Sequence, residues 1–288
     1  MRAPSRSRGQ PRVMIGGVVA LTACLTLALA AVAAPPGGGP SAAADPAASF
    51  PPGLAVESDV TSGPLDATGA TWTVRVPRLT GPFDPAVLEA IDGALATSAA
   101  DDLAVFEAGS SAPIDEAMST DEFSEDFTVA LLTPDLVSIR VLAYTYPSGA
   151  AHGGTALETW NFDLATGRRL ALADLFSPGV DYLDAIATEA RRSLLDRYAT
   201  DRSSRQWVKE GTQPNEANYS GWAMTPDGLE ITFGQYQVAP YAEGMPVVVI
   251  GWSWLAGLLD PGGPAAAFLD SAGQPAPLPT PSMSPSAS

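Results

Sequence analysis

Alternating apolar and polar positions predict several β-strands along this chain. Trp72, Val74 and Val76 alternate with polar residues and predict the first strand. Pro226-Asp227-Gly228 has the composition of a tight turn, because proline fixes φ early in a turn and glycine accepts a positive φ late. We therefore expect a hairpin around it, and further strands in the remaining alternating runs. The expected strands after the first cover residues 127–133, 137–146, 156–163, 222–233 (the hairpin) and 247–250.

Two segments have instead the three-to-four-residue apolar spacing of an amphipathic helix. The first opens at Asp84-Pro85, where aspartate suits the N-cap and proline the first helical position. The second opens at Ser177-Pro178 and is expected to run to about Ala199. The polar residues 200–218 predict a loop, and a short last helix is expected from Trp254.

This order of elements predicts an α+β fold. A strand, a helix, several strands, a second helix and more strands do not form the regular βαβ alternation of a doubly wound sheet. We therefore expect antiparallel sheets with two main helices, in one compact body of two sub-lobes. The expected sub-lobes are residues 57–168 and residues 169–258.

The N-terminal residues 1–33 have the layout of an export signal. Four arginines without an acid precede an uncharged run, and Ala31-Val32-Ala33 is a small-residue cleavage site. If the run of 22 residues were retained, a helix of about 33 Å would be long enough to anchor the chain in a bilayer. Lipidation at Cys24 is a third outcome. The run ends in alanines, which favours cleavage and an extracellular location, or one on the outer face of the cytoplasmic membrane.

Two further segments have the composition of disordered chain. Residues 34–56 are expected to be a flexible linker, and the Pro- and Ser-rich residues 259–288 a disordered tail.

Charge and composition exclude several functions. The formal net charge of −17 disfavours nucleic acid and anionic lipid and favours basic partners. Cys24 is the only cysteine and His152 the only histidine, so a zinc site is not expected. The acidic cluster of residues 115–126 lacks the alternating spacing of a calcium loop and predicts a solvated loop. No metal and no cofactor are assigned. The acids of the cluster are Asp115, Glu116, Asp121, Glu122, Glu125 and Asp126.

Several separated motifs occur in one order along the chain. They are Tyr144-Thr-Tyr-Pro-Ser-Gly-Ala-Ala-His-Gly153, Trp160-Asn-Phe-Asp-Leu-Ala-Thr-Gly-Arg168, Leu172-Ala-Asp-Leu-Phe176, and the aromatic residues 222–250. Over about residues 57–257 the chain resembles the family of extracytoplasmic domains found in the anti-sigma factor RsiV. The same domain occurs in secreted mycobacterial immunogenic proteins and beside some peptidoglycan deacetylases.

The resemblance implies a binding surface built from these motifs. Tyrosine and tryptophan combine apolar area with a polar tip, which suits ligand contacts and sugar stacking, although the same residues also pack sheet cores. His152 lies on a glycine-flanked turn, where it contacts a ligand or only pins the turn through hydrogen bonds. The candidate binding residues are Tyr144, Tyr146, His152, Gly153, Trp160, Tyr236 and Tyr241.

Three functions remain open from the sequence. The first is a non-catalytic binding or sensing module that recognises a cell-wall glycan, or a basic protein such as lysozyme. The second is a secreted esterase or glycan-ester hydrolase, since esterase activity is associated with some members of the resembled family. No Gly-x-Ser-x-Gly elbow is present and no nucleophile pairs with His152, so no catalytic residue is assigned. The third is an exported protein without a ligand.

Overall fold

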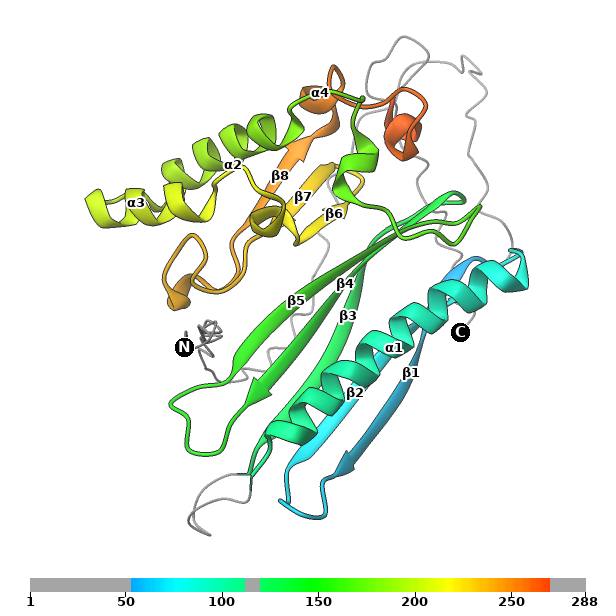
Figure 1. Cartoon of the computed structure of the whole chain (residues 1–288), viewed down its shortest axis with the longest axis vertical. Helices are drawn as coiled ribbons and strands as arrows, with labels where there is room; N and C mark the ends of the chain where they lie inside the picture. Colours follow the sequence, from blue (N-terminus) through cyan, green and yellow to red (C-terminus); the bar gives the residue numbers. More distant parts are fainter. Residues whose placement is uncertain (1–52, 112–119, 270–288) are drawn as a thin grey trace, which may run out of the picture.

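The computed structural model describes residues 53–111 and 120–269, which form two sheets and the helices around them (Figure 1). The first sheet has the order β1-β2-β3-β4-β5, and the second has the order β6-β7-β8. The α+β fold is therefore confirmed. The strands are β1 (Ala55–Pro64), β2 (Thr71–Thr80), β3 (Glu122–Leu132), β4 (Leu136–Tyr146), β5 (Gly154–Asp163), β6 (Trp222–Met224), β7 (Gly228–Thr232) and β8 (Val247–Gly251). The helices are α1 (Pro85–Gly109), α2 (Tyr182–Tyr198), α3 (Arg202–Gly211) and α4 (Trp252–Leu255), with 3₁₀ turns η1 (Leu172–Leu175), η2 (Glu216–Tyr219), η3 (Tyr241–Glu243) and η4 (Pro264–Phe268).

Some sequence-based expectations concern residues outside these ranges. They are the export signal with Cys24, most of the linker, the acids Asp115 and Glu116, and the tail from residue 270. In residues 53–111 and 120–269, none of the helices combines the length and the apolar character needed to span a bilayer.

Helix α1 packs along one face of the first sheet (Figure 1). The Asp84 side chain caps it by accepting a hydrogen bond from the backbone N–H of Ala86 at 2.8 Å, as the sequence predicted. Its apolar stripe buries Ile91 and Leu95 against the sheet. Because α1 connects β2 to β3, these two strands run parallel, whereas the other pairs are antiparallel. The expectation of only antiparallel pairing is wrong at this connection.

The second sheet packs on the opposite face of the first. Side chains alternate along β4, so Ile139 points toward α1 while Arg140 points toward β7 and forms an ion pair with Glu230 at 2.9 Å. The buried Asn161 amide donates to the carbonyl of Trp222 at 3.1 Å. Helix α2 contacts β8 and covers the outer face of the second sheet (Figure 1). These directional bonds fix how the loop after β7 lies relative to the turn between β4 and β5.

Two segments expected to lack regular structure are ordered. Residues 200–218, expected to form a loop, contain α3, because Asp201 and Ser204 form a reciprocal cap and Val208 is buried. The expected linker overlaps β1, which begins at Ala55 and pairs with β2 over its whole length.

Two further segments, residues 259–269 and the start of α2, also differ from the expectation. Residues 259–269 belong to the core rather than to a disordered tail, because Phe268 stacks on Trp252 with ring centroids 4.0 Å apart. Helix α2 begins at Tyr182 with Asp181 as its N-cap, while Ser177 accepts a turn hydrogen bond from the N–H of Val180.

Candidate functional site

Four aromatic side chains from three separate segments form a connected row. Trp207 comes from α3, Tyr236 and Tyr241 from the loop between β7 and β8, and His152 from the turn between β4 and β5. The ring centroids are 6.4 Å apart for Trp207 and Tyr236, 5.5 Å for Tyr236 and Tyr241, and 4.8 Å for Tyr241 and His152. The His152 and Tyr241 rings are within 3° of parallel. Each of the four residues is partly exposed, so this aromatic row is available to a ligand.

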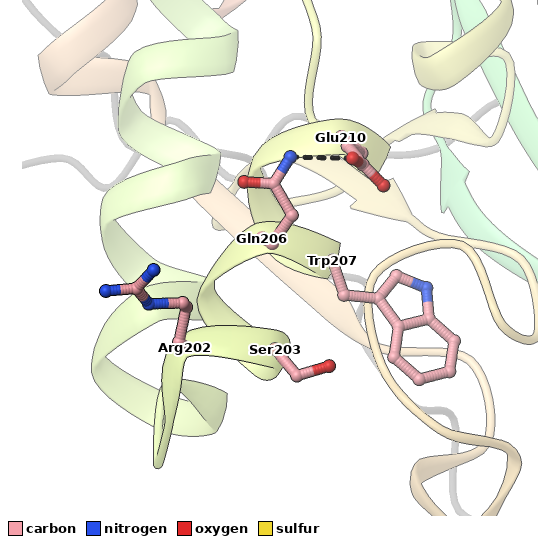
Figure 2. Close-up of a pocket in the computed structure, with 5 residues that line it drawn as sticks. All are labelled: Arg202, Ser203, Gln206, Trp207 and Glu210. Carbon is pink, nitrogen blue, oxygen red and sulfur yellow. Dashed lines mark hydrogen bonds between the residues drawn. The ribbon is translucent and has the colours of Figure 1, made fainter.

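Tyr236, within the row, has an unusual backbone conformation and accepts a short hydrogen bond from Trp207. Tyr236 has φ of +62°, the only positive φ of a non-glycine among the described residues. Such a conformation persists only where its surroundings hold it, and it is concentrated at functional sites. The indole N–H of Trp207 donates to the carbonyl of Tyr236 at 2.6 Å. Figure 2 shows the Trp207 indole projecting from α3 beside the loop that follows β7, at one end of an open hollow of about 580 Å³.

The end of β4 adds two tyrosines, Tyr144 and Tyr146, beside the row. A Cβ at Gly153 would lie 2.5 Å from the ring of Tyr144, so glycine is what allows this tyrosine to lie against the turn. Burial raises the pKa of Tyr144, and the nearby Glu122, Tyr241 and Tyr146 add to the shift. The Tyr146 hydroxyl donates to the carbonyl of Ala150 at 2.9 Å and ties the turn to the strand.

The structure therefore gathers most of the predicted binding residues at one place, and it separates one of them. Trp160 is buried on the other face of the first sheet, where it packs on Phe162 and lies under the guanidinium of Arg169 at 3.5 Å. It takes no part in the aromatic row. The sequence analysis missed Trp207, because its polar neighbours hid the helix that carries it. The residues brought together are Tyr144, Tyr146, His152, Gly153, Tyr236 and Tyr241.

A cavity of about 290 Å³ lies next to Tyr236, between the edge of β5 and the loop after β7. Gln237 fixes that loop, because its amide donates to the carbonyls of Gly211 and Asn218 at 3.1 and 2.9 Å. The same side chain accepts from the N–H of Gly234 at 2.9 Å. The cavity wall is thus rigid on the loop side.

His152 has no partner that would make it a catalytic base. Its Nδ1 is buried, and no hydrogen bond to it is formed by the residues that the structure describes. A hydrolytic triad would need a hydroxyl bonded to this ring and a carboxylate that orients it. Neither is bonded to it in residues 53–111 and 120–269, and within those ranges no three potential metal ligands are grouped.

A second group of titratable side chains lies under α1, on the face of the first sheet opposite Tyr144. Glu125 of β3 is only 3% exposed and one of its carboxyl oxygens, Oε2, has no hydrogen-bond partner among the described residues. Burial raises its pKa to about 7, and the adjacent Asp102 and Glu158 add to the shift. The expectation of a solvated acidic loop is therefore wrong for Glu125 and for Asp121, which is also buried. Glu122 and Asp126 are exposed, but they lie in β3 rather than in a loop. Glu125 lies in β3, whose alternation turns it toward α1 like Phe123.

Comparison with known proteins finds similarity over part of this chain. Residues 173–253 match the family described as "Protein of unknown function (DUF3298)". Two solved structures have the same fold: DUF3298 family proteins from Pseudomonas aeruginosa PAO1 and Bacteroides fragilis NCTC 9343. Their TM-scores are 0.54 and 0.53 at 17% and 18% identity, over 72% of this chain and 95% and 94% of theirs. Residues 173–253 are therefore similar to the DUF3298 family, and the described chain has the fold of its solved members.

Two curated relatives carry functional names. Over 140 residues the chain is 31% identical to peptidoglycan-N-acetylmuramic acid deacetylase PdaC of Bacillus subtilis, covering 48% of this chain and 29% of that protein. Over 111 residues it is 28% identical to esterase Rv3036c of Mycobacterium tuberculosis, covering 38% of this chain and 47% of that protein. The chain spans less than half of either relative. The expected similarity to peptidoglycan deacetylases is confirmed over these 140 residues.

Proposed function

We propose that this chain is an exported, non-catalytic binding module that recognises cell-wall glycan through the aromatic row. The observation that carries the proposal is the contact between four partly exposed rings supplied by three segments, with a strained tyrosine at its centre. The similarity to a peptidoglycan deacetylase over 140 residues supports a ligand in the cell wall.

The chemistry of the row suits sugars. Aromatic faces stack on the apolar C–H faces of pyranose rings, while phenol and indole groups supply hydrogen bonds at the edges. The net charge of −17 disfavours strongly anionic polymers such as nucleic acids and favours neutral or basic ligands. A glycan strand carries far less charge than a nucleic acid and is compatible with this net charge.

Replacing Tyr241 with alanine should weaken glycan binding at least about tenfold, a loss of about 1.4 kcal/mol. Tyr241 is the link between His152 and Tyr236, so its removal divides the aromatic row. Titration calorimetry with soluble, peptide-free peptidoglycan strands measures the effect. Trp254→Ala is the matched control, because this tryptophan is 46% exposed but lies outside the row. Equal affinities of wild type and Tyr241→Ala would contradict the assignment.

A basic protein ligand is the partner that the RsiV resemblance implies. The acidic body would attract a lysozyme-like protein over long range, and salt would weaken that attraction. The same calorimeter separates the two ligand classes when lysozyme is titrated at low and at high salt. If lysozyme binds and glycan strands do not, the ligand is a basic protein and the glycan assignment is wrong.

Ester hydrolysis is the second candidate, favoured by the relative named as an esterase. Its reaction would have to use His152, the only histidine. Turnover of a chromogenic ester above the buffer rate, abolished in His152→Ala, would establish this function. Turnover at the buffer rate removes it.

A further inference from the structure

The outer edge of β5 presents unpaired backbone groups beside the aromatic row. In an antiparallel pair, every second residue directs its N–H and C=O away from the partner strand. The N–H of Thr155 donates outward to the side chain of Gln235 at 3.3 Å, and the carbonyl of Thr159 accepts outward from Arg169 at 2.9 Å. Leu157 lies between them in the same alternation, so its N–H and C=O also point outward.

Leu157 differs from these two neighbours, each of which has one of its two outward groups bonded. Among the described residues no side chain or backbone group bonds to its N–H or C=O. Leu157 lines the cavity of about 290 Å³, together with Tyr236 of the aromatic row. Unpaired backbone groups at the wall of a cavity are satisfied by water or by a ligand. The cavity thus offers one donor and one acceptor, a few ångströms apart, beside an aromatic ring.

We propose that this cavity binds the acetamido group of an N-acetylated sugar, whose C=O would accept a hydrogen bond from the N–H of Leu157 while its pyranose ring lies against Tyr236. The acetamido C=O is an acceptor for the outward N–H of Leu157, and the outward C=O of Leu157 remains available to a sugar hydroxyl. The volume is at the small end of ligand sites, which suits one sugar residue rather than a long segment. Gln235, Ser220 and Thr232 add polar side chains for the sugar hydroxyls. This inference rests on the proposed glycan-binding function and specifies the sugar.

The discriminating ligands are β-1,4-linked oligosaccharides of equal length, made either of N-acetylglucosamine or of glucose. Both are neutral and differ only at the 2-substituent, so charge does not affect the comparison. We expect the acetylated oligosaccharide to bind about tenfold more tightly, the value of one lost hydrogen bond. Equal affinities, or binding of peptidoglycan strands but of neither oligosaccharide, would overturn the acetamido site and leave the glycan-binding function standing. If binding instead requires the stem peptide of peptidoglycan, the edge of β5 pairs with a peptide and the acetamido assignment is wrong.

A cavity-filling substitution locates the effect. Gly234 lines the cavity, and a Cβ there would meet only Gln237 Oε1 at 3.7 Å, so Gly234→Leu projects into the space without a backbone clash. It should remove the preference for the acetylated oligosaccharide and leave the melting temperature close to that of the wild type. Gly93→Leu on α1 is the matched control, because a Cβ at that glycine contacts nothing within 4 Å. An unchanged preference in a folded Gly234→Leu protein would place the acetamido group elsewhere.

Discussion

Replacing Glu125 with glutamine should remove a loss of stability that the wild type suffers as the pH rises from about 5 to about 7. The carboxyl group of Glu125 has a pKa of about 7 in the folded protein, against an ordinary value of 4.5, because it is buried beside Asp102 and Glu158. The folded protein therefore binds more protons than the unfolded chain between these two pH values. Its free energy of unfolding falls with increasing pH over that window and becomes level above it.

The expected size of the effect is on the order of 3 kcal/mol, since each pKa unit corresponds to about 1.4 kcal/mol. Burial and the nearby Glu158 also raise the pKa of Asp102, which acts in the same direction. Urea unfolding at pH 4.5 and pH 8 measures the difference between wild type and Glu125→Gln. The matched control is Glu122→Gln, an exposed glutamate on the same strand. If the free energies of unfolding of wild type and Glu125→Gln differ by the same amount at both pH values, the pKa of Glu125 is not raised by burial.

Replacing Phe268 with alanine should destabilise the protein by about 3–5 kcal/mol, the usual cost of removing a buried phenylalanine. Phe268 is fully buried near the C-terminal end of the described chain, and its ring stacks on Trp252. The midpoint of urea unfolding measures the loss. Val105→Ala, at a valine that is 69% exposed, should change the stability by less than about 0.5 kcal/mol. A loss below about 1 kcal/mol for Phe268→Ala would mean that the segment 259–269 does not belong to the core.

Helices and strands with local signals can be predicted from the sequence, whereas those that depend on contacts with distant residues cannot. The cap at Asp84 and the turn before Gly228 are local signals, and the structure confirms both. Helix α3 was missed because Trp207 and Val208 are the only large apolar residues among its ten, and its stability depends on contacts with distant segments such as Tyr236. Phe268 was missed for the same reason, since its partner Trp252 lies across a proline- and glycine-containing turn.

Part of the candidate site was also predictable, because its motifs follow one another in the sequence. Tyr144 and His152 belong to one motif of the sequence and Tyr241 to another, and the three lie close together in the structure. Trp160 lies apart, because a strand buried on both faces gives no periodic signal of which face a given residue occupies. The free N–H and C=O of Leu157 follow from strand register and edge position, and neither can be obtained from residue types alone.

The most direct test of the aromatic row as the binding surface is the indole N–H resonance of Trp207 in a nitrogen–proton correlation spectrum during titration with peptidoglycan strands. This N–H bonds to the carbonyl of Tyr236 within the row, whereas those of Trp160 and Trp252 bond to Glu158 and to the carbonyl of Thr225 elsewhere. We predict a saturable shift of the Trp207 signal, with the signals of Trp160 and Trp252 unchanged. Binding that leaves the Trp207 signal in place, or no change in any signal at saturating glycan, would contradict the proposal.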